Sequence, residues 1–387
     1  MIFTEIRFIL LVAACWVSFF GVPRRYRAHA LAFWGVVFYG LYAGRYLPLV
    51  AALVLGVHLL SKPRSAWMAV AGVAAFLAYV KFGVVGFGVT AMGITGGSGA
   101  AALIPLGVSF LAFELMHFAI ERRRGRLGDA SLIDLAAFAF FFPCRVAGPI
   151  KRFGDFTAAV ARAEASLDDV YAGVLRILMG LVKKVVIADV LALTVAEVGY
   201  AATPAHVWKI VLAYSLQIFF DFSAYSDIAI GVSRVLGVTV PENFRWPYLS
   251  PNIQEFWSRW HITLSWWVRD YVFLPMGHAM FRSRLRGDPL VIAATSYLVS
   301  FLIFGAWPGL MVNYLVWGAY HGVLLTGYQV ARVRMPQALT TSRLYRSPVA
   351  STAGAAITFA FVSVGWVPFM TNLPDAWRLL RIMFAVV

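Results

Sequence analysis

Apolar runs of about 20 residues, separated by short basic loops, recur along most of this 387-residue chain. A run of that length is enough to cross the bilayer once as a helix. Of the residues, 61% are hydrophobic and 13% are charged, whereas about 25% are charged in an ordinary soluble protein. The pattern excludes that class and predicts an all-α polytopic integral membrane protein, with residues 1–387 forming a single transmembrane domain.

The runs predict about ten or eleven membrane-spanning helices. The first run, Phe8–Val22, is preceded by residues with almost no net charge. It is followed by Arg24, Arg25 and Arg27, as at a stop-transfer boundary. It is therefore expected to be an uncleaved span and not a signal peptide. The other expected spans lie near residues 29–44, 46–61, 65–89, 103–121, 131–148, 172–200, 207–237, 289–308, 311–331 and 349–371.

The charges of the loops predict an orientation. Basic loops at residues 24–27, 62–64 and 122–126 alternate with an uncharged loop at 93–99, so the positive-inside rule places them in the cytoplasm and the N-terminus outside. Two later basic loops, at 282–286 and 332–346, are two spans apart and fall on one side, which agrees with this orientation.

The net charge of +15 is explained by these loops, so the expected partner is the lipid bilayer and not a nucleic acid. Cys15 and Cys144 lie in apolar runs and predict no disulfide framework. The chain has no His/Cys cluster at metal spacing, no Walker loop and no GxSxG elbow, so no metal site is expected.

Two carboxylates, Asp221 and Asp227, interrupt an apolar run. Such residues are costly in a membrane and often mark functional sites. Because they are six residues apart, they face different sides of a regular helix. They are predicted to be two separate anchoring points; the alternative is that each pairs with a nearby arginine or caps a broken helix.

A second polar segment covers residues 252–277 and contains Trp257, Arg259, Trp260 and His261. It is too charged for a lipid-exposed span, so we expect a re-entrant or interfacial helix pair. Either the segment lines a polar cavity, or it is an anchoring belt in which His261 is only hydrogen-bonded.

A third polar position, His321, lies halfway along an apolar run, beside Trp317. Gly318 and Gly322 are four residues apart and leave one helix face bare, which suits either a closely approaching ligand or a small-residue packing seam. A neutral imidazole can take a proton from a hydroxyl and return it to a leaving thiolate, so it suits acyl transfer.

Six stretches carry a resemblance to a known family. They lie at residues 104–113, 141–153, 180–192, 216–231, 241–277 and 317–324, and the last two contain the histidines. The chain resembles the membrane-bound O-acyltransferase (MBOAT) superfamily, in particular its bacterial alginate O-acetylation and D-alanyl transfer branch, over a motif-bearing core of about residues 100–330. The resemblance implies a ring of helices around a central tunnel, in a bacterial cytoplasmic (inner) membrane.

The resemblance also implies roles for individual residues. His321 matches the essential histidine of the family and His261 the second one. Further site or tunnel positions are implied at Asp221, Asp227, Trp257, Arg259, Trp260 and Trp317. The implied donor is acetyl-CoA or an acyl-carrier thioester, with no bound cofactor; the implied partners are a periplasmic acyltransferase and the polysaccharide export machinery.

The chain departs from the family pattern in two places. Pro308 stands where many relatives have a histidine within Gly-Leu-Trp-His-Gly, which bears on acceptor or partner specificity, and the chain ends soon after residue 371. The resulting hypothesis is an O-acyltransferase, moving an acyl (acetyl) group from a cytoplasmic thioester to an exported or cell-surface polysaccharide. The alternative is a transporter or proton/ion channel that uses Asp221, Asp227 and His321.

Overall fold

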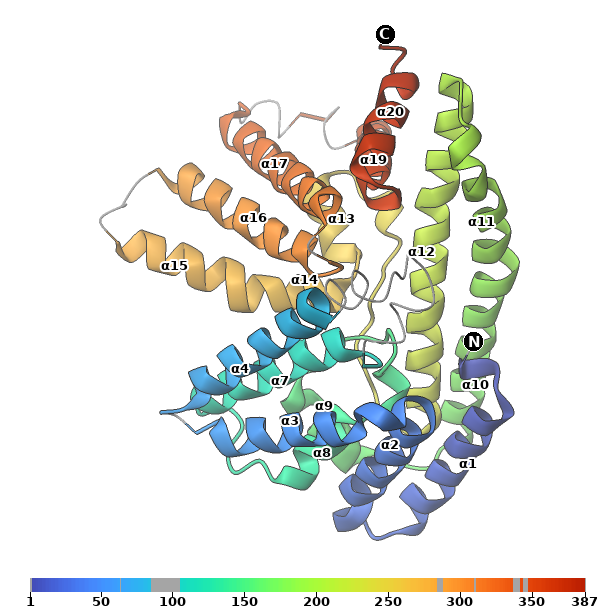
Figure 1. The fold of residues 1–387 in the computed structure, drawn as a ribbon, viewed down its shortest axis with the longest axis vertical. Helices are drawn as coiled ribbons and strands as arrows, with labels where there is room; N and C mark the ends of the chain where they lie inside the picture. Colours follow the sequence, from blue (N-terminus) through green and yellow to red (C-terminus); the bar gives the residue numbers. More distant parts are fainter. Residues whose placement is uncertain are drawn as a thin grey trace. The chain divides into compact units, whose positions relative to one another are not determined.

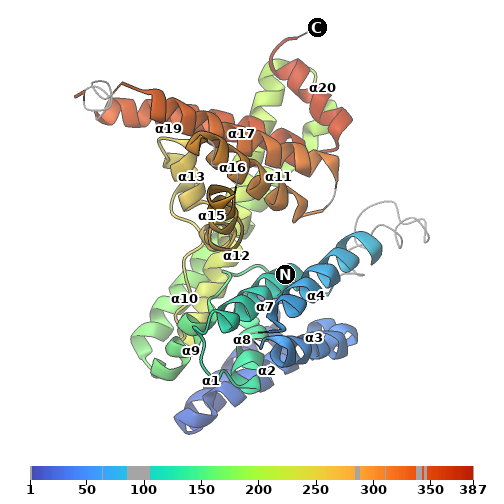
Figure 2. The ribbon, with the colours of Figure 1, turned by 90° about the vertical axis from the view of Figure 1, so that its left-hand side faces the viewer.

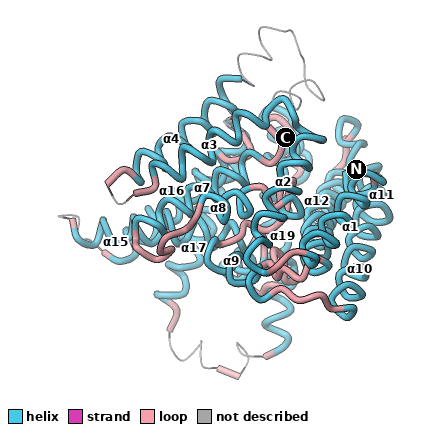
Figure 3. The backbone as a smooth tube through the Cα atoms, turned by 90° about the horizontal axis from the view of Figure 1, so that it is seen from below, coloured by secondary structure: helices cyan, strands magenta, loops and turns pink. Residues whose placement is uncertain are grey.

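The computed structural model describes residues 2–62, 64–84, 105–283, 288–309, 311–336, 342–343 and 347–386. All regular structure in these ranges is helical (Figure 3). Pro63, the uncharged loop expected at 93–99, and parts of the basic loops at 282–286 and 332–346 lie outside the described residues.

The chain divides into two compact units. Unit 1 comprises Met1–Val182 and Ala224–Glu242, and unit 2 comprises Lys183–Ser223 and Asn243–Val387. The long helix α12 (Pro204–Val235) contributes residues to both. That the whole chain forms one transmembrane domain stays a prediction.

Unit 1 begins with a group of short apolar helices. They are α1 (Ile6–Gly21), α2 (Arg27–Ala43), α3 (Leu47–Leu60), α4 (Ala66–Ala78) followed by a π-helical turn (Tyr79–Val84), α7 (Val108–Arg123) and α8 (Leu132–Ala139). Helix α4 packs along α7, and α2 packs along α8 (Figures 1 and 2).

The single span expected at 131–148 is wrong. Helix α8 ends at Ala139, and a separate 3-10 turn follows at Phe142–Cys144. Pro143 contributes to the break, because proline has no N–H to donate to the carbonyl of Ala139, four residues earlier. The eight residues of α8 cover only about 12 Å, too little to cross a bilayer.

A buried ion cluster lies in the same part of unit 1. The Glu114 carboxylate contacts Nζ of Lys151 at 2.5 Å and a terminal guanidinium nitrogen of Arg145 at 3.4 Å. All three side chains are at most 2% exposed. The cluster joins α7 to the loop that follows α8, and its one carboxylate balances two cations that are both removed from water.

A long helical stretch completes unit 1 and enters unit 2. After α9 (Phe153–Arg162) come α10 (Leu167–Leu181), a π-helical segment (Val182–Ala188), α11 (Asp189–Val195) and a 3-10 turn (Ala196–Tyr200). In unit 1, α10 packs on α12 through facing glycines: a Cβ on Gly173 would lie 2.7 Å from the carbonyl oxygen of Gly231. Only glycine permits the two backbones to approach so closely.

Unit 2 is built from the remaining helices. They are α13 (Ile253–Arg259), α14 (Ile262–Val268), a π-helical turn (Arg269–Phe273), α15 (Leu274–Arg282), α16 (Pro289–Ala306), α17 (Val312–Arg334), α19 (Pro348–Met370) and α20 (Leu373–Met383). Helices α16 and α17 run side by side (Figure 1). A Cβ on Gly318 would lie 2.3 Å from the carbonyl oxygen of Phe301, so the small-residue seam is confirmed at this position.

Membrane-spanning candidates occur in both units. Among the described residues, four segments are long and apolar enough to cross a bilayer: Arg24–Leu60, Pro204–Val235, Pro289–Ala306 and Pro348–Met370. Shorter apolar segments lie at Ile6–Gly21, Ala66–Lys81 and Leu132–Cys144. The last two each combine an α-helix with the π-helical or 3-10 turn that follows it. The prediction of an all-α polytopic membrane protein is confirmed, whereas the number of ten or eleven spans stays a prediction.

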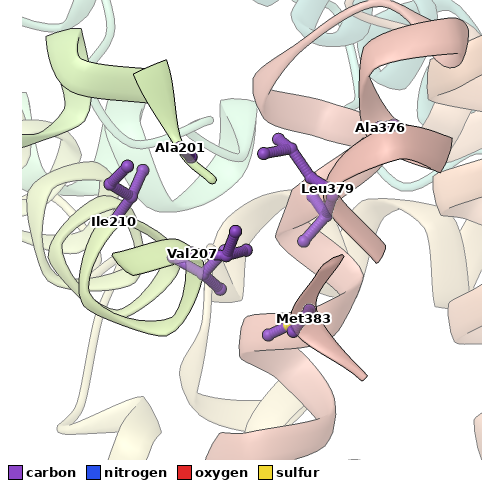
Figure 4. Packing of buried hydrophobic residues seen from close by; sticks show 8 residues of the cluster. Ala201, Val207, Ile210, Ala376, Leu379 and Met383 are labelled. Carbon is purple, nitrogen blue, oxygen red and sulfur yellow. The ribbon is translucent and has the colours of Figure 1, made fainter. Parts of the chain in front are cut away.

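The last helix packs on the start of α12. Figure 4 shows side chains of α20, among them Leu379 and Met383, pointing toward Val207 and Ile210 of α12. Each of these four side chains is at most 3% exposed. Burial of this apolar face holds α20 against α12 within unit 2.

Candidate active site

His321 lies at the centre of an aromatic cluster in unit 2. It is on α17 and is 0% exposed. The rings of Trp257 and Trp317 each have their centroid 5.1 Å from that of the imidazole, and Trp257 is almost perpendicular to it, at 89°. Neither ring nitrogen of His321 has a hydrogen-bond partner among the described residues. A buried imidazole with both nitrogens unsatisfied is unusual, which makes His321 a candidate functional residue.

Gly365 of α19 faces one of these nitrogens. A Cβ at this position would lie 2.9 Å from Nε2 of His321 and 2.8 Å from the Tyr320 ring. The absence of a side chain therefore lets the backbone of α19 pack directly beside Nε2.

A hydrogen-bonded chain supports the far side of the cluster. Trp317 stacks on Trp366, with centroids 5.7 Å apart and an interplanar angle of 18°. The indole N–H of Trp366 donates to the hydroxyl of Tyr248 (3.2 Å), which donates in turn to the carbonyl of Ser215 (2.6 Å). Within unit 2, these bonds connect α19 to the turn before α13, and that turn to α12. They hold Trp366, and with it Trp317, in place beside His321.

Asn243 fixes the second histidine. Its Oδ1 accepts a hydrogen bond from the hydroxyl of Thr263 at 2.9 Å, and Nδ1 of His261 lies 3.0 Å from the same oxygen. The backbone N–H of Thr263 points to it as well, at 3.4 Å. Because Oδ1 can only accept, Nδ1 of His261 carries the proton, and in a neutral ring Nε2 is then the basic nitrogen.

The backbone at His261 has an uncommon conformation. The chain turns sharply there between α13 and α14, with a φ of 43° in the left-handed region. Asn252 begins α13 by accepting from the backbone N–H of Glu255 at 2.8 Å. Left-handed geometry in a non-glycine residue costs free energy and often occurs at functional sites. The helix pair expected in 252–277 is confirmed; its position in the membrane stays a prediction.

The two histidines share a cluster but do not touch each other's rings. His261 contacts Phe222 (4.7 Å between centroids) and Trp307 (5.8 Å). Trp307 contacts Phe304, which packs on Trp257. The structure thus brings His261, Trp257, Trp317 and His321 into one aromatic assembly of unit 2.

A cavity of about 370 Å³ opens beside this assembly, between α13, α14 and α16. Trp257 and Phe301 line it, and both rings also contact the imidazole of His321. Its lining combines aromatic rings with polar groups that include Ser265, Arg269 and Ser300. Concave, largely apolar cavities with a few polar groups are typical of small-molecule sites.

Two other predicted site residues flank the assembly. Trp260 is 4% exposed and packs on Trp366, with centroids 5.2 Å apart. Arg259 forms an ion pair with Glu255, one turn earlier on α13. In the structure Trp260 is a packing residue, and the guanidinium of Arg259 is engaged in an ion pair. Their roles in the site stay predictions.

Asp221 and Asp227 of α12 each form an ion pair with a basic side chain. In unit 2, Asp221 pairs with Nζ of Lys184 at 2.8 Å, and in unit 1, Asp227 pairs with Nε of Arg176 at 2.6 Å. Helix α12 continues without a break through both. The alternative of pairing with an arginine is confirmed for Asp227, whereas Asp221 pairs with a lysine.

Several residues of the site were not predicted from the sequence. Asn243 lies inside a family-like stretch, but a lone asparagine carries no pattern that indicates its three donors. Gly365 and Trp366 lie beyond the expected core of about residues 100–330. A small residue followed by tryptophan within an apolar run is the only signal that could have indicated them.

The comparison with protein families decides the identity of the fold. Residues 74–364 match the family model of the membrane-bound O-acyltransferases, which is more than half of the chain. The chain belongs to the membrane-bound O-acyltransferase family. Its MBOAT region includes both histidines and the aromatic assembly around them.

Named relatives of this MBOAT protein come from bacteria. It is 33% identical to the "Probable alginate O-acetylase AlgI" of Azotobacter vinelandii, over 100% of this chain and 78% of the relative. It is likewise 33% identical to the protein of that name from Pseudomonas syringae pv. tomato, over 84% of this chain and 62% of the relative. It is 35% identical to the "Teichoic acid D-alanyltransferase" of Bacillus subtilis, over 58% of each. The aligned part thus falls well short of the full length of these relatives.

Proposed function

We propose that this protein is a membrane O-acyltransferase with His321 as its catalytic base. The observation that carries the proposal is the imidazole of His321, which is fully buried and has no hydrogen-bond partner among the described residues. Membership of the MBOAT family supports the same reaction class.

The proposed reaction needs only a hydroxyl acceptor and a thioester donor. The acceptor oxygen attacks the thioester carbonyl while Nε2 of His321 takes the hydroxyl proton. The carbon–sulfur bond then breaks, and the proton passes to the leaving thiolate, giving an ester and a free thiol. Gly365 lies beside this nitrogen, and the acceptor hydroxyl is proposed to approach on this side.

The cavity lined by Trp257 and Phe301 is the proposed site for the acyl end of the donor. Both rings line it and also contact the imidazole of His321, so the cavity adjoins the proposed base. Small-molecule cavities usually measure about 300–1,000 Å³, so its volume of about 370 Å³ suits an acetyl group and part of its thiol carrier. His261, with Nε2 as its basic nitrogen, is proposed to position the donor or to share the proton.

The proposed donor is a cytoplasmic thioester, acetyl-CoA or an acyl-carrier protein, and the product an O-acylated exported or cell-surface polysaccharide. The names of the relatives support this, because two of these names refer to O-acetyl transfer: the alginate O-acetylases, and the "Peptidoglycan O-acetyltransferase" of Helicobacter pylori. The basic loops favour the cytoplasmic membrane with the N-terminus outside. A periplasmic acyltransferase and the polysaccharide export machinery are the proposed partners.

The ion pairs of α12 disfavour the transporter alternative. A proton path requires carboxylates that gain and lose protons. Asp221 and Asp227 are each engaged in an ion pair with a basic side chain, at 2.8 Å and 2.6 Å, so neither is a free carboxylate poised on such a path.

Reconstitution into vesicles separates the two functions. With acetyl-CoA labelled on the acetyl group and an oligosaccharide acceptor on the opposite side, we expect labelled ester and released thiol from the wild type, and neither from His321→Ala. His278→Ala is the matched control, because His278 is exposed on α15 of the same unit. Proton flux without thiol release would instead support the transporter. Thiol release with the acetyl label retained on the protein, and no ester on the oligosaccharide, would mean that a partner completes the transfer.

A further inference from the structure

Helix α20 has the properties of a helix that lies along a membrane surface. It follows α19, a spanning candidate, after a turn in which Asn372 accepts from the backbone N–H of Asp375 at 3.0 Å. One face, with Leu379 and Met383, is buried against α12, whereas Trp377 on another face is 65% exposed. An amphipathic helix with exposed tryptophan at the end of a span is typical of the bilayer interface.

An open groove of about 460 Å³ lies between α20 and the segment that leads into α12. We call it the α20 groove; Pro204, Trp377, Arg378, Arg381 and Ile382 are among its lining residues. The lining contains two arginines and no carboxylate, and its other residues are apolar. Such a combination suits a ligand that has both an anionic group and an apolar part.

The two arginines differ in how they are held. Arg378 donates to the carbonyls of Ala201 (3.1 Å) and Val198 (3.3 Å), so its guanidinium is fixed at the groove. Arg381 is exposed, and its side chain forms no hydrogen bond or ion pair within the described part of the chain. Asp375 is 3.8 Å from Nε of Arg378, so these three side chains together carry one net positive charge.

The predicted orientation makes these arginines unexpected. Asn313, at the start of α17, donates to the carbonyls of Pro368 and Thr371 (both 3.1 Å), so α17 begins where α19 ends. The basic loop at the other end of α17 is predicted to be cytoplasmic, which places α20 at the outer surface. The positive-inside rule disfavours arginine there, so a local function for the pair is called for.

We propose that the α20 groove binds the headgroup of an anionic phospholipid. Two guanidinium groups donate to the phosphate oxygens, which arginine geometry suits. Trp377 and Ile382 contact the glycerol backbone and the first part of an acyl chain. A bilayer lipid is favoured over a soluble anion because the groove is mostly apolar and adjoins a membrane span.

Native mass spectrometry of the purified full chain tests the proposal. The protein is equilibrated in detergent with equal amounts of phosphatidylglycerol and phosphatidylcholine, and lipid adducts are counted. We expect the wild type to retain phosphatidylglycerol preferentially and Arg381→Gln to lower that preference about fivefold, as expected for one cation at a membrane surface. The side chain of Arg381 bonds to no described residue, so this variant should fold normally.

The control variant is Arg334→Gln, at the exposed last turn of α17 and outside the groove. It should keep the preference of the wild type. Equal retention of both lipids by the wild type, an unchanged preference in Arg381→Gln, or an equal loss in Arg334→Gln would overturn the proposal. Displacement of phosphatidylglycerol by excess inorganic phosphate would show a small-anion site and overturn the lipid assignment.

Discussion

The indole of Trp257 stands edge-on against the imidazole of His321, with ring centroids 5.1 Å apart and an angle of 89° between the planes. Trp257 also lines the adjoining cavity, so it borders both the proposed donor site and the base. This geometry makes the tryptophan a positioning residue for the imidazole.

Replacement of Trp257 should therefore lower acylation according to how much of the ring is lost. We expect Trp257→Ala to lower the rate of acyl transfer by about tenfold or more, because the imidazole loses its packing partner and the cavity loses a lining ring. Trp257→Phe keeps an aromatic edge and should retain most activity. The measurement is labelled acetyl transfer in membrane vesicles at equal protein abundance. Equal rates in both variants would contradict the positioning role.

A methyl group at Gly365 should obstruct the catalytic nitrogen. The added Cβ would lie 2.9 Å from Nε2 of His321, closer than carbon and nitrogen normally approach. We expect Gly365→Ala to lose most acyl transfer while its membrane abundance stays near that of the wild type. Gly327→Ala is the control, because on the same helix as His321 it would meet no atom within 4 Å. A fully active Gly365→Ala protein would argue against this approach to the base.

Removal of the Asn243 side chain should affect the proton position on His261. Asn243→Ala removes the acceptor that holds Nδ1–H and leaves the Thr263 donors unsatisfied. The rate of acyl transfer should fall about tenfold, because a buried donor without an acceptor costs free energy of about that order. Thr263→Val removes only one donor and should have a smaller effect, measured in the same vesicle assay. A larger loss in Thr263→Val than in Asn243→Ala would refute the proposed tautomer control.

The buried ion cluster predicts a stability difference. Glu114→Gln would leave Lys151 and Arg145 buried without their carboxylate, at a cost of about 3–5 kcal/mol. Glu164→Gln breaks the Arg24 pair, whose side chains are 66% and 74% exposed, and should cost less than about 1 kcal/mol. Denaturant unfolding in one detergent compares them. Similar losses in both variants would contradict the account.

The sequence predicted the class of fold because hydrophobic run length is a direct consequence of bilayer thickness. It failed at residues 131–148, where apolarity persists although Pro143 ends the helix. Glu114 also escaped notice, because a single acidic residue in an apolar run does not reveal that Arg145 and Lys151 lie next to it.

For the site, sequence pattern and resemblance indicated His321, His261 and Trp257, which the structure places in one aromatic assembly. The supporting residues Gly365 and Asn243 were missed because their roles depend on what other segments bring near them. A glycine beside a nitrogen, or an amide shared by several donors, is a property of the fold and not of the local sequence.

The most direct test of the central claim measures ester-linked acyl groups on the polysaccharide of cells that carry wild-type, His321→Ala or His278→Ala protein. Membrane abundance is checked in each strain. We predict that His321→Ala abolishes ester content at normal abundance, whereas His278→Ala retains it. Unchanged ester content in His321→Ala would contradict a catalytic role for this histidine.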